Sequence, residues 1–131
     1  MIVVDTSAAF AIVAGETERD AFIDRLDTEK AIMSAVSYVE TVMVLTGRSK
    51  RLALSRVDEL LVLFKIEIVA VDRMIASAAI NAFDRYGKGR HPARLNLSDC
   101  FSYALARARD LPLLFKGGDF ARTDVVPAWR P

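Results

Sequence analysis

Hydrophobic residues along the chain form short runs that alternate with longer stretches of helical spacing. The short runs are rich in β-branched residues and predict strands at 2–4, 31–33, 67–71 and 111–115. The longer stretches place apolar residues three to four positions apart and predict helices at 7–14, 16–26, 37–48, 52–64, 74–86 and 98–109. The pair Val125–Val126 predicts a short fifth strand.

The alternation of strands and helices determines the expected fold class. Successive strand–helix–strand units build parallel sheets with helices on both faces. We therefore expect an α/β fold, a three-layer sandwich with a central, mostly parallel sheet of four to five short strands. The 131 residues fit a single domain covering 1–131.

Composition narrows the class of protein. The single cysteine, Cys100, excludes an intramolecular disulfide, argues against a cysteine-based zinc site and suits a reducing cytosol. The amino terminus lacks the basic start of a signal peptide, and no apolar run approaches the ~20 residues that cross a bilayer. We therefore expect a cytoplasmic protein with no membrane partner. Because the net charge is only +1, any surface that binds nucleic acid must be local.

Acidic side chains fall where this type of fold binds its ligands. In parallel α/β sheets, ligands bind outside the carboxyl ends of the strands. Asp5 directly follows the first strand and Asp119 follows the fourth. Glu40 lies early in the helix after the second strand, and Asp99 opens the helix that precedes the fourth. We expect these four carboxylates to meet at one edge of the sheet.

Each of these acids also has a purely structural interpretation. Ser37 and Glu40 have the spacing of a helix capping box. Asp5, Asp99 and Asp119 each suit a helix N-cap. Taken together, however, four anions at one edge repel each other unless a cation lies among them. Ligands that are all oxygen favour Mg²⁺ or Mn²⁺ over Zn²⁺.

The segments that carry the acids resemble those of PIN-domain ribonucleases, and within that family VapC-type toxins. The matching segments are 2–8 (IVVDTSA), 95–106 (LNLSDCFSYALA), 113–120 (LLFKGGDF) with 123–125 behind it and, more loosely, 37–41 (SYVET). The resemblance implies a PIN-like fold and a magnesium-dependent endoribonuclease inhibited by a small, VapB-like antitoxin. It also implies that Asp5, Glu40, Asp99 and Asp119 form the metal site, with Asp5 and Asp99 as the most direct ligands.

The resemblance gives further residues a predicted role. The segment 85–94 has no acid and leads toward Asp99, so its cations predict contacts with RNA phosphates, the alternative being a solvated flexible loop. These cations are Arg85, Lys88, Arg90 and Arg94. Lys116 either contacts the substrate or only flanks the fourth strand. His91 is interpreted as an RNA contact or a turn residue, because its neighbours do not suit a cation site.

Residues beside the acids are predicted to support them. Thr6 and Ser7 are expected to orient Asp5 or to bind a phosphate oxygen, and either also suits the N-cap of the next helix. Asp124 either supports the site or caps the turn into the last strand. Cys100 is expected to be a buried helix residue beside the site.

Apolar surface on the predicted helices 16–26 and 52–64 points to partners. A groove between them suits an amphipathic antitoxin helix, and the alternative is ordinary core or a homodimer face. The resemblance implies a homodimer that forms a heterotetramer or a larger assembly with the antitoxin.

Other functions are compatible with parts of this pattern. The chain could act with its antitoxin as a DNA-binding repressor whose acids anchor the partner, or as a housekeeping RNA-processing PIN nuclease. A receiver domain requires an acidic pair after the first strand, where the sequence has Asp5 and then Thr6. A phosphatase of the haloacid-dehalogenase type requires a second aspartate at the position of Ser7.

Overall fold

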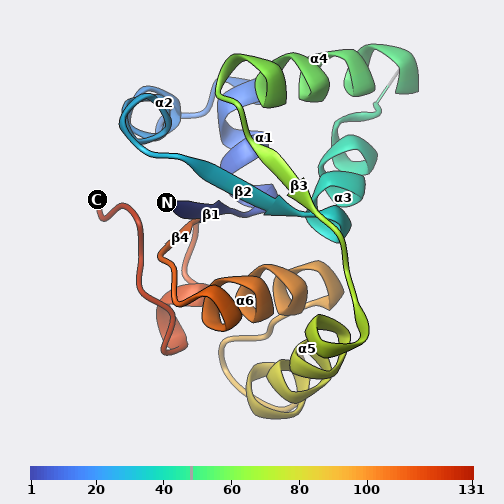
Figure 1. The fold of residues 1–131 in the computed structure, drawn as a ribbon, viewed down its shortest axis with the longest axis vertical. Helices are drawn as coiled ribbons and strands as arrows, with labels where there is room; N and C mark the ends of the chain where they lie inside the picture. The colour runs from blue at the N-terminus through green and yellow to red at the C-terminus, as the bar shows by residue number, and fades with distance from the viewer. Residues whose placement is uncertain (48) are drawn as a thin grey trace.

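The computed structural model describes residues 1–47 and 49–131, and these form four strands and six α-helices (Figure 1). The strands are β1 (Ile2–Val4), β2 (Ala31–Ser34), β3 (Glu67–Val69) and β4 (Leu113–Leu114). The helices are α1 (Thr6–Ala14), α2 (Arg19–Thr28), α3 (Ala35–Leu45), α4 (Lys50–Leu63), α5 (Arg73–Tyr86) and α6 (Leu97–Arg109), followed by a 3₁₀ turn, η1 (Phe120–Arg122).

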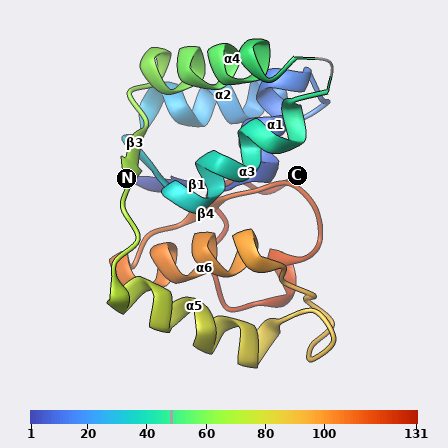
Figure 2. The same ribbon diagram turned by 90° about the vertical axis from the view of Figure 1, so that its right-hand side faces the viewer.

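The four strands form one parallel sheet in the order β3-β2-β1-β4. Val3 of the central strand β1 lies opposite Ile32 on one side and Leu113 on the other. Helices α1, α2 and α4 lie above the sheet in Figures 1 and 2, and α5 and α6 lie below it. The predicted three-layer α/β fold is therefore confirmed, and all four strands end at the same edge.

The alternation of side chains along the buried strands divides the core into two layers. Val3 and Ile32 pack against α5 and α6, whereas Ile2, Val4 and Met33 pack against α1 and α2. Successive residues of a strand point to opposite faces of the sheet. Because helices cover both faces, these strands are apolar at nearly every position.

Several element boundaries differ from the sequence prediction. Gly15, with a φ of 71°, ends α1 in the left-handed conformation, and a turn delays the start of α2 to Arg19 rather than residue 16. Residues 125–126 do not form the expected fifth strand, and the pairing there is an isolated bridge between Leu113 and Pro127. The Leu113 N–H donates to Val126 O and the Leu113 carbonyl accepts from Ala128 N, both at 2.8 Å. Proline at 127 has no N–H with which to extend the pairing. Arg48, the last residue of the helix predicted at 37–48, lies outside the described residues.

Helix α3 begins directly after β2, which overturns the predicted capping box at Ser37 and Glu40. Its N-cap is Ser34, whose Oγ accepts from Val36 N at 3.2 Å. Ser37 is therefore already inside the helix, and Glu40 lies more than a turn from its start. The Glu40 side chain is left available for another role.

The basic segment 85–94 is ordered by a tight contact at Gly87. This residue follows α5 in an extended conformation, with a φ of −67°, rather than as a left-handed cap. A Cβ at Gly87 would lie 2.4 Å from both a ring carbon and the carbonyl oxygen of Phe83, so only glycine fits. His91 Nδ1 accepts from Ala93 N at 3.0 Å, and its ring packs edge-on against Tyr86. His91 is thus a turn residue.

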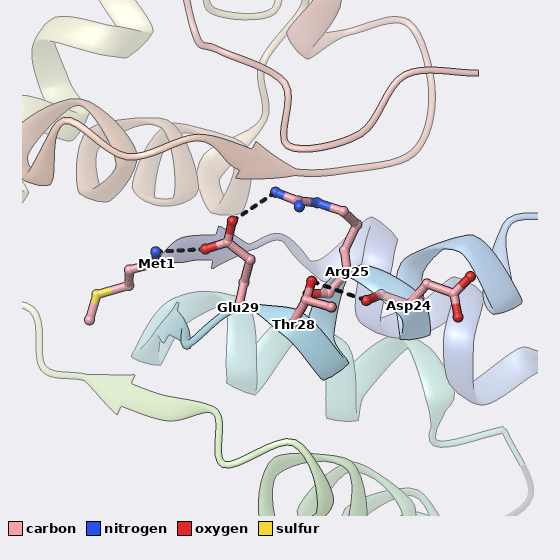
Figure 3. A network of polar contacts seen from close by, with 5 residues as sticks. All are labelled: Met1, Asp24, Arg25, Thr28 and Glu29. Atoms are coloured by element: carbon pink, nitrogen blue, oxygen red, sulfur yellow. Dashed lines mark hydrogen bonds and ion pairs between the residues drawn. The ribbon is translucent and has the colours of Figure 1, made fainter.

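Polar contacts at the opposite, amino edge of the sheet fix the starts of β1 and β2 (Figure 3). The Met1 amino nitrogen donates to Glu29 at 2.8 Å, and Arg25 donates to the other carboxylate oxygen of Glu29 at 3.2 Å. These groups belong to the scaffold and are remote from the carboxyl edge. Within the part of the chain that the structure describes, none of the helices has both the length and the apolar character to span a bilayer.

Candidate active site

A cavity of about 460 Å³ lies at the carboxyl edge of the sheet, the edge that Figure 2 faces. Four separate segments bring their acids to its wall: Asp5 from the end of β1, Glu40 from α3, Asp99 from the first turn of α6 and Asp119 from the start of η1. We call this cavity the acidic pocket. Its formation follows from the parallel topology, because strand ends and the following helix starts meet at one edge.

Asp5 is the most deeply placed of these acids, with 1% of its surface exposed. It is the N-cap of α1, and its Oδ2 accepts from Ser7 N at 2.9 Å and from Ser7 Oγ at 2.7 Å. Its Oδ1 accepts from Ser102 Oγ at 2.6 Å. Ser7 therefore orients Asp5, as predicted, whereas the alternative that Thr6 or Ser7 is the N-cap is wrong.

Buried hydroxyl groups behind Asp5 join three helices. Ser37 Oγ lies 2.7 Å from Ser102 Oγ, which connects α3 to α6. Thr6 Oγ1 donates to Ser37 O at 3.1 Å and lies 3.4 Å from Ser98 Oγ. Sequence analysis missed Ser37 and Ser102 in this role. The available signal was the position of Ser102 three residues after Asp99, which places both on one face of α6.

Asp99 has a structural bond and an unfavourable electrostatic environment. Its backbone N donates to Asn96 Oδ1 at 2.9 Å, and its Oδ2 accepts from Asn96 N at 3.0 Å, which is a complete capping box. Burial, assisted by the charges of Asp5, Glu40 and Asp119 and opposed by the hydrogen bond from Asn96 N, raises the pKa of Asp99 to about 7. The ionised carboxylate at Asp99 is therefore in a position where a nearby cation would stabilise it.

Glu40 and Asp119 lie toward the mouth of the acidic pocket. Glu40 is half-buried and Asp119 is exposed. Asp119 occupies the N-cap position of η1 without a capping hydrogen bond from its side chain. Among the described residues, no three acidic, histidine or cysteine side chains are close enough as they stand to hold an ion jointly. The four acids thus surround a space instead of converging on a point.

Lys116 is the predicted substrate-contacting cation that lines the acidic pocket. Its backbone N donates to Ser7 Oγ at 3.0 Å. The Ser7 hydroxyl therefore accepts from Lys116 while it donates to Asp5. Its ammonium lies 3.0 Å from Glu16 and 3.2 Å from Glu18, and these carboxylates raise the pKa of Lys116.

The other predicted RNA-binding cations do not line the acidic pocket. Arg85 pairs with Asp124 at 3.6 Å, and its guanidinium lies over the Tyr86 ring. Arg90 pairs with Asp84 at 3.7 Å and lies over Phe83. These partners come from the fold around the end of α5, which the linear sequence does not reveal. The remaining two cations of the loop, Lys88 and Arg94, are exposed there as well.

Asp124 also lies outside the wall of the acidic pocket. It accepts a short hydrogen bond from the Tyr103 hydroxyl and pairs with Arg85 and with Arg107, the latter at 3.8 Å. Asp124 therefore contacts side chains of α6, the helix that carries Asp99. The turn that follows is supported by Thr123, whose Oγ1 accepts from Val125 N at 3.3 Å.

Asp124→Asn is expected to lower the melting temperature at pH 7. The Tyr103 hydrogen bond, followed by Arg107 and Arg85, holds the pKa of Asp124 below its usual value of 3.8. A depressed folded-state pKa gives stability that is present above the unfolded pKa and lost as the pH falls through the folded one. Melting curves of both proteins should therefore differ at pH 7, begin to converge below about pH 4 and meet only below the folded-state pKa of Asp124. A difference that is independent of pH would contradict this assignment.

Comparison with known proteins gives consistent matches along the chain. The model of the PIN domain family matches residues 2–126. The chain is 43% identical over 129 residues to ribonuclease VapC42 of Mycobacterium tuberculosis, covering 97% of this chain and 98% of that protein. It is 40% identical over 131 residues to ribonuclease VapC30 of the same species, covering 99% and 100%, and 44% identical over 126 residues to ribonuclease VapC of Mycolicibacterium smegmatis, covering 95% and 98%.

Solved structures agree with the fold. The chain matches the sarcin-ricin loop cleaving toxin VapC20 of M. tuberculosis with a TM-score of 0.79, 20% identity and full coverage of both chains. It matches a chain of a toxin–antitoxin complex from Klebsiella pneumoniae with a TM-score of 0.74, 19% identity and full coverage. Together with the family match, these likenesses rule against the receiver and dehalogenase alternatives.

Proposed function

The chain belongs to the PIN-domain family and to the VapC ribonucleases within it, and from this membership we propose that its acidic pocket is the centre of a divalent-metal-dependent endoribonuclease. The protein acts as the toxin of a toxin–antitoxin pair and hydrolyses RNA phosphodiester bonds. The observation that carries this proposal is the gathering of Asp5, Glu40, Asp99 and Asp119 around one pocket from four segments of the chain.

The donor atoms of the pocket fit a hard divalent cation. All four acids offer oxygen, which Mg²⁺ and Mn²⁺ prefer. The pKa of Asp99 is raised by burial and, to a smaller extent, by the charges of the other acids, and a bound cation would offset both effects. We propose Mg²⁺, held by Asp5 and Asp99, with Glu40 and Asp119 contributing at the mouth. The spacing of the acids suits an ion that retains much of its hydration. A cation held by these residues would supply Lewis-acid activation of water and stabilisation of negative charge on the phosphoryl oxygens.

The chain's own residues prepare the pocket for this chemistry. Ser7 and Ser102 fix both oxygens of Asp5 in one orientation. The hydroxyl of Ser37 and the backbone N–H of Lys116 in turn fix those two serines. Hydrogen bonds of this kind hold metal ligands in place and tune their affinity.

Ser102→Ala is expected to slow cleavage roughly 10- to 100-fold, chiefly through weaker metal binding, which is the usual effect of losing a partner of a metal ligand. The free energy of unfolding should fall by about 1–3 kcal/mol, because the buried Asp5 carboxylate loses one of its donors. Mn²⁺ titration by calorimetry gives a measure of binding that is independent of cleavage. Ser98→Ala is the matched control, because Ser98 is also buried on α6 but contacts Thr6 rather than Asp5. Equal Mn²⁺ affinity in Ser102→Ala and the wild type would refute this role.

Exposed apolar side chains support the proposed partners. Helix α4 exposes Val62 by 78% and Leu63 by 73%, which suits an amphipathic segment of a VapB-like antitoxin. Val39 and Met43 of α3 and Ile80 of α5 are exposed on another part of the surface. We propose that this second surface forms a homodimer, and that the dimer binds antitoxin as a heterotetramer or a larger assembly.

Analysis of the cleavage products tests the reaction. Purified protein freed of antitoxin, incubated with end-labelled RNA and Mg²⁺, should produce 5′-phosphate and 3′-hydroxyl ends. These ends follow from in-line attack by water on the phosphorus with the 3′ oxygen as the leaving group. A 2′,3′-cyclic phosphate would instead indicate attack by the neighbouring ribose hydroxyl and would overturn the proposed mechanism.

A further inference from the structure

A second cavity, of about 440 Å³, borders the acidic pocket and shares Lys116 and Gly117 with it. Its wall is built from the end of β4 and from the C-terminal segment, which pairs with β4 at Leu113. The residues that give this cavity its character are Phe115, Pro127, Trp129 and Arg130. We call it the Trp129 pocket.

The indole of Trp129 forms part of the wall of this pocket. Trp129 is half-buried, and its ring meets Phe22 edge to face, with centroids 5.2 Å apart and an interplanar angle of 88°. Such a contact covers at most one face of the indole. Phe22 is fully buried, so Trp129 is anchored to the core. An anchored aromatic ring of this kind loses little conformational entropy when a ligand stacks on it.

Arg130 gives the Trp129 pocket a cation that suits a ligand carrying phosphate. The Arg130 guanidinium lines the pocket and is exposed. The Lys116 ammonium stands between the two pockets, where Glu16 and Glu18 hold it. Glu18 lines the Trp129 pocket too, and its charge is engaged by Lys116. The pocket thus combines an aromatic wall with cations at its boundary.

We propose that the Trp129 pocket binds an unpaired nucleobase of the RNA substrate, next to the phosphate held in the acidic pocket. The base stacks on Trp129, and Arg130 contacts the RNA backbone. This inference rests on the proposed nuclease function and adds to it a subsite that selects single-stranded or flipped-out bases. Stacking on aromatic side chains is the common means by which proteins bind unpaired bases, and Arg adds to it electrostatically.

Fluorescence provides a direct test, because Trp129 is the only tryptophan in the sequence. Full-length Asp99→Asn protein, which should bind RNA without cutting it, is titrated with a short unlabelled single-stranded oligoribonucleotide in Mg²⁺. We expect quenching of the tryptophan emission that saturates together with binding measured by anisotropy of a labelled copy. N-acetyltryptophanamide corrects for absorption by the RNA. Saturable RNA binding without quenching would overturn the proposal.

Substitutions that act on the two walls separately provide the second test. Ala121→Leu fills the pocket from η1 and leaves the contact between Trp129 and Phe22 in place, and Trp129→Leu removes the stacking surface. Each should weaken RNA binding roughly 5- to 100-fold, the range expected for one stacked base. Arg109→Ala, at the far end of α6, is the charge-loss control for Arg130→Ala. Melting curves establish that each variant is folded.

The outcomes separate the subsite from the nuclease activity. Metal-dependent cleavage by the wild type, with unchanged KM and kcat in Ala121→Leu, would overturn the Trp129 pocket and leave the proposed function standing. Loss of antitoxin binding with intact RNA binding in the same variants would assign the pocket to the partner instead. Absence of both cleavage and RNA binding in the wild type would overturn the proposed function together with the subsite.

Discussion

Asp99→Asn is expected to abolish RNA cleavage and to leave the metal-free protein at least as stable as the wild type. The cleavage rate should fall by at least about a hundred-fold. Removing a residue that only hydrogen-bonds to a metal ligand already lowers activity by up to about a hundred-fold, and Asp99 is proposed as a ligand itself. Stability should be maintained because an asparagine oxygen can still accept from Asn96 N and keep the capping box. The substitution also removes one of four mutually repelling charges from the acidic pocket.

Two measurements check this expectation. Cleavage of labelled RNA in Mg²⁺ gives the activity, and thermal unfolding in EDTA gives the stability. In Mg²⁺ the order should reverse, because a cation bound to the wild type raises its melting temperature and the variant gains less. Cleavage by Asp99→Asn at the wild-type rate would remove Asp99 from the site. A variant that fails to fold would contradict the inference that the Asp99 charge destabilises the fold in the absence of metal.

Asp5→Ala is expected to abolish cleavage and, unlike Asp99→Asn, to destabilise the fold. The change removes the N-cap of α1 and the acceptor for Ser7 and Ser102 in an almost fully buried place. Loss of a cap and an unsatisfied buried donor together should cost about 2–4 kcal/mol in the free energy of unfolding. Denaturant melts of the metal-free proteins measure this cost without any contribution from metal binding.

Asp5→Asn is the matched comparison at the same position. The amide oxygen of the asparagine can accept from Ser7. Its NH₂ group can donate to the Ser102 hydroxyl, provided that this hydroxyl rotates and donates its own hydrogen to Ser37. The fold should therefore be nearly unchanged while cleavage is still lost. If Asp5→Ala and Asp5→Asn unfold at the same denaturant concentration, the hydrogen bonds around Asp5 do not stabilise the fold as we infer.

The sheet and the convergence of acids could be predicted because both follow from chain order. Strands that alternate with helices are parallel, and parallel strands end at one edge. This reasoning places Asp5 and Asp119 near each other without knowledge of side-chain packing. It also brings Asp99 to that edge, since a helix that leads into a parallel strand begins where the strands end.

The contact between Ser37 and Ser102 behind Asp5 could not be predicted because it depends on the rotation of helices against each other. Ser37 and Ser102 are 65 positions apart and meet only where α3 crosses α6. The structural alternative for Glu40, a capping box with Ser37, is wrong because β2 runs directly into the helix and Ser34 is the N-cap of α3.

The basic loop illustrates a different limit of sequence reasoning. Its proximity to Asp99 along the chain suggested a role at the pocket. In the fold, Gly87 packs against Phe83, and the neighbouring arginines turn toward Asp84 and Asp124. The arginines of this loop are therefore close to Asp99 in the sequence but do not line the acidic pocket. Trp129, which is distant in the sequence, lines the pocket next to it.

The most direct test of the central claim is metal-dependent RNA cleavage by the purified wild-type protein. The protein is freed of antitoxin, stripped with EDTA, shown to be folded and incubated with a pool of structured RNAs. We expect no cleavage in EDTA and cleavage at defined sites when Mg²⁺ or Mn²⁺ is restored. Cleavage that persists in EDTA, or its absence with either metal across the pool, would contradict the assignment of the acidic pocket as a metal-dependent ribonuclease centre.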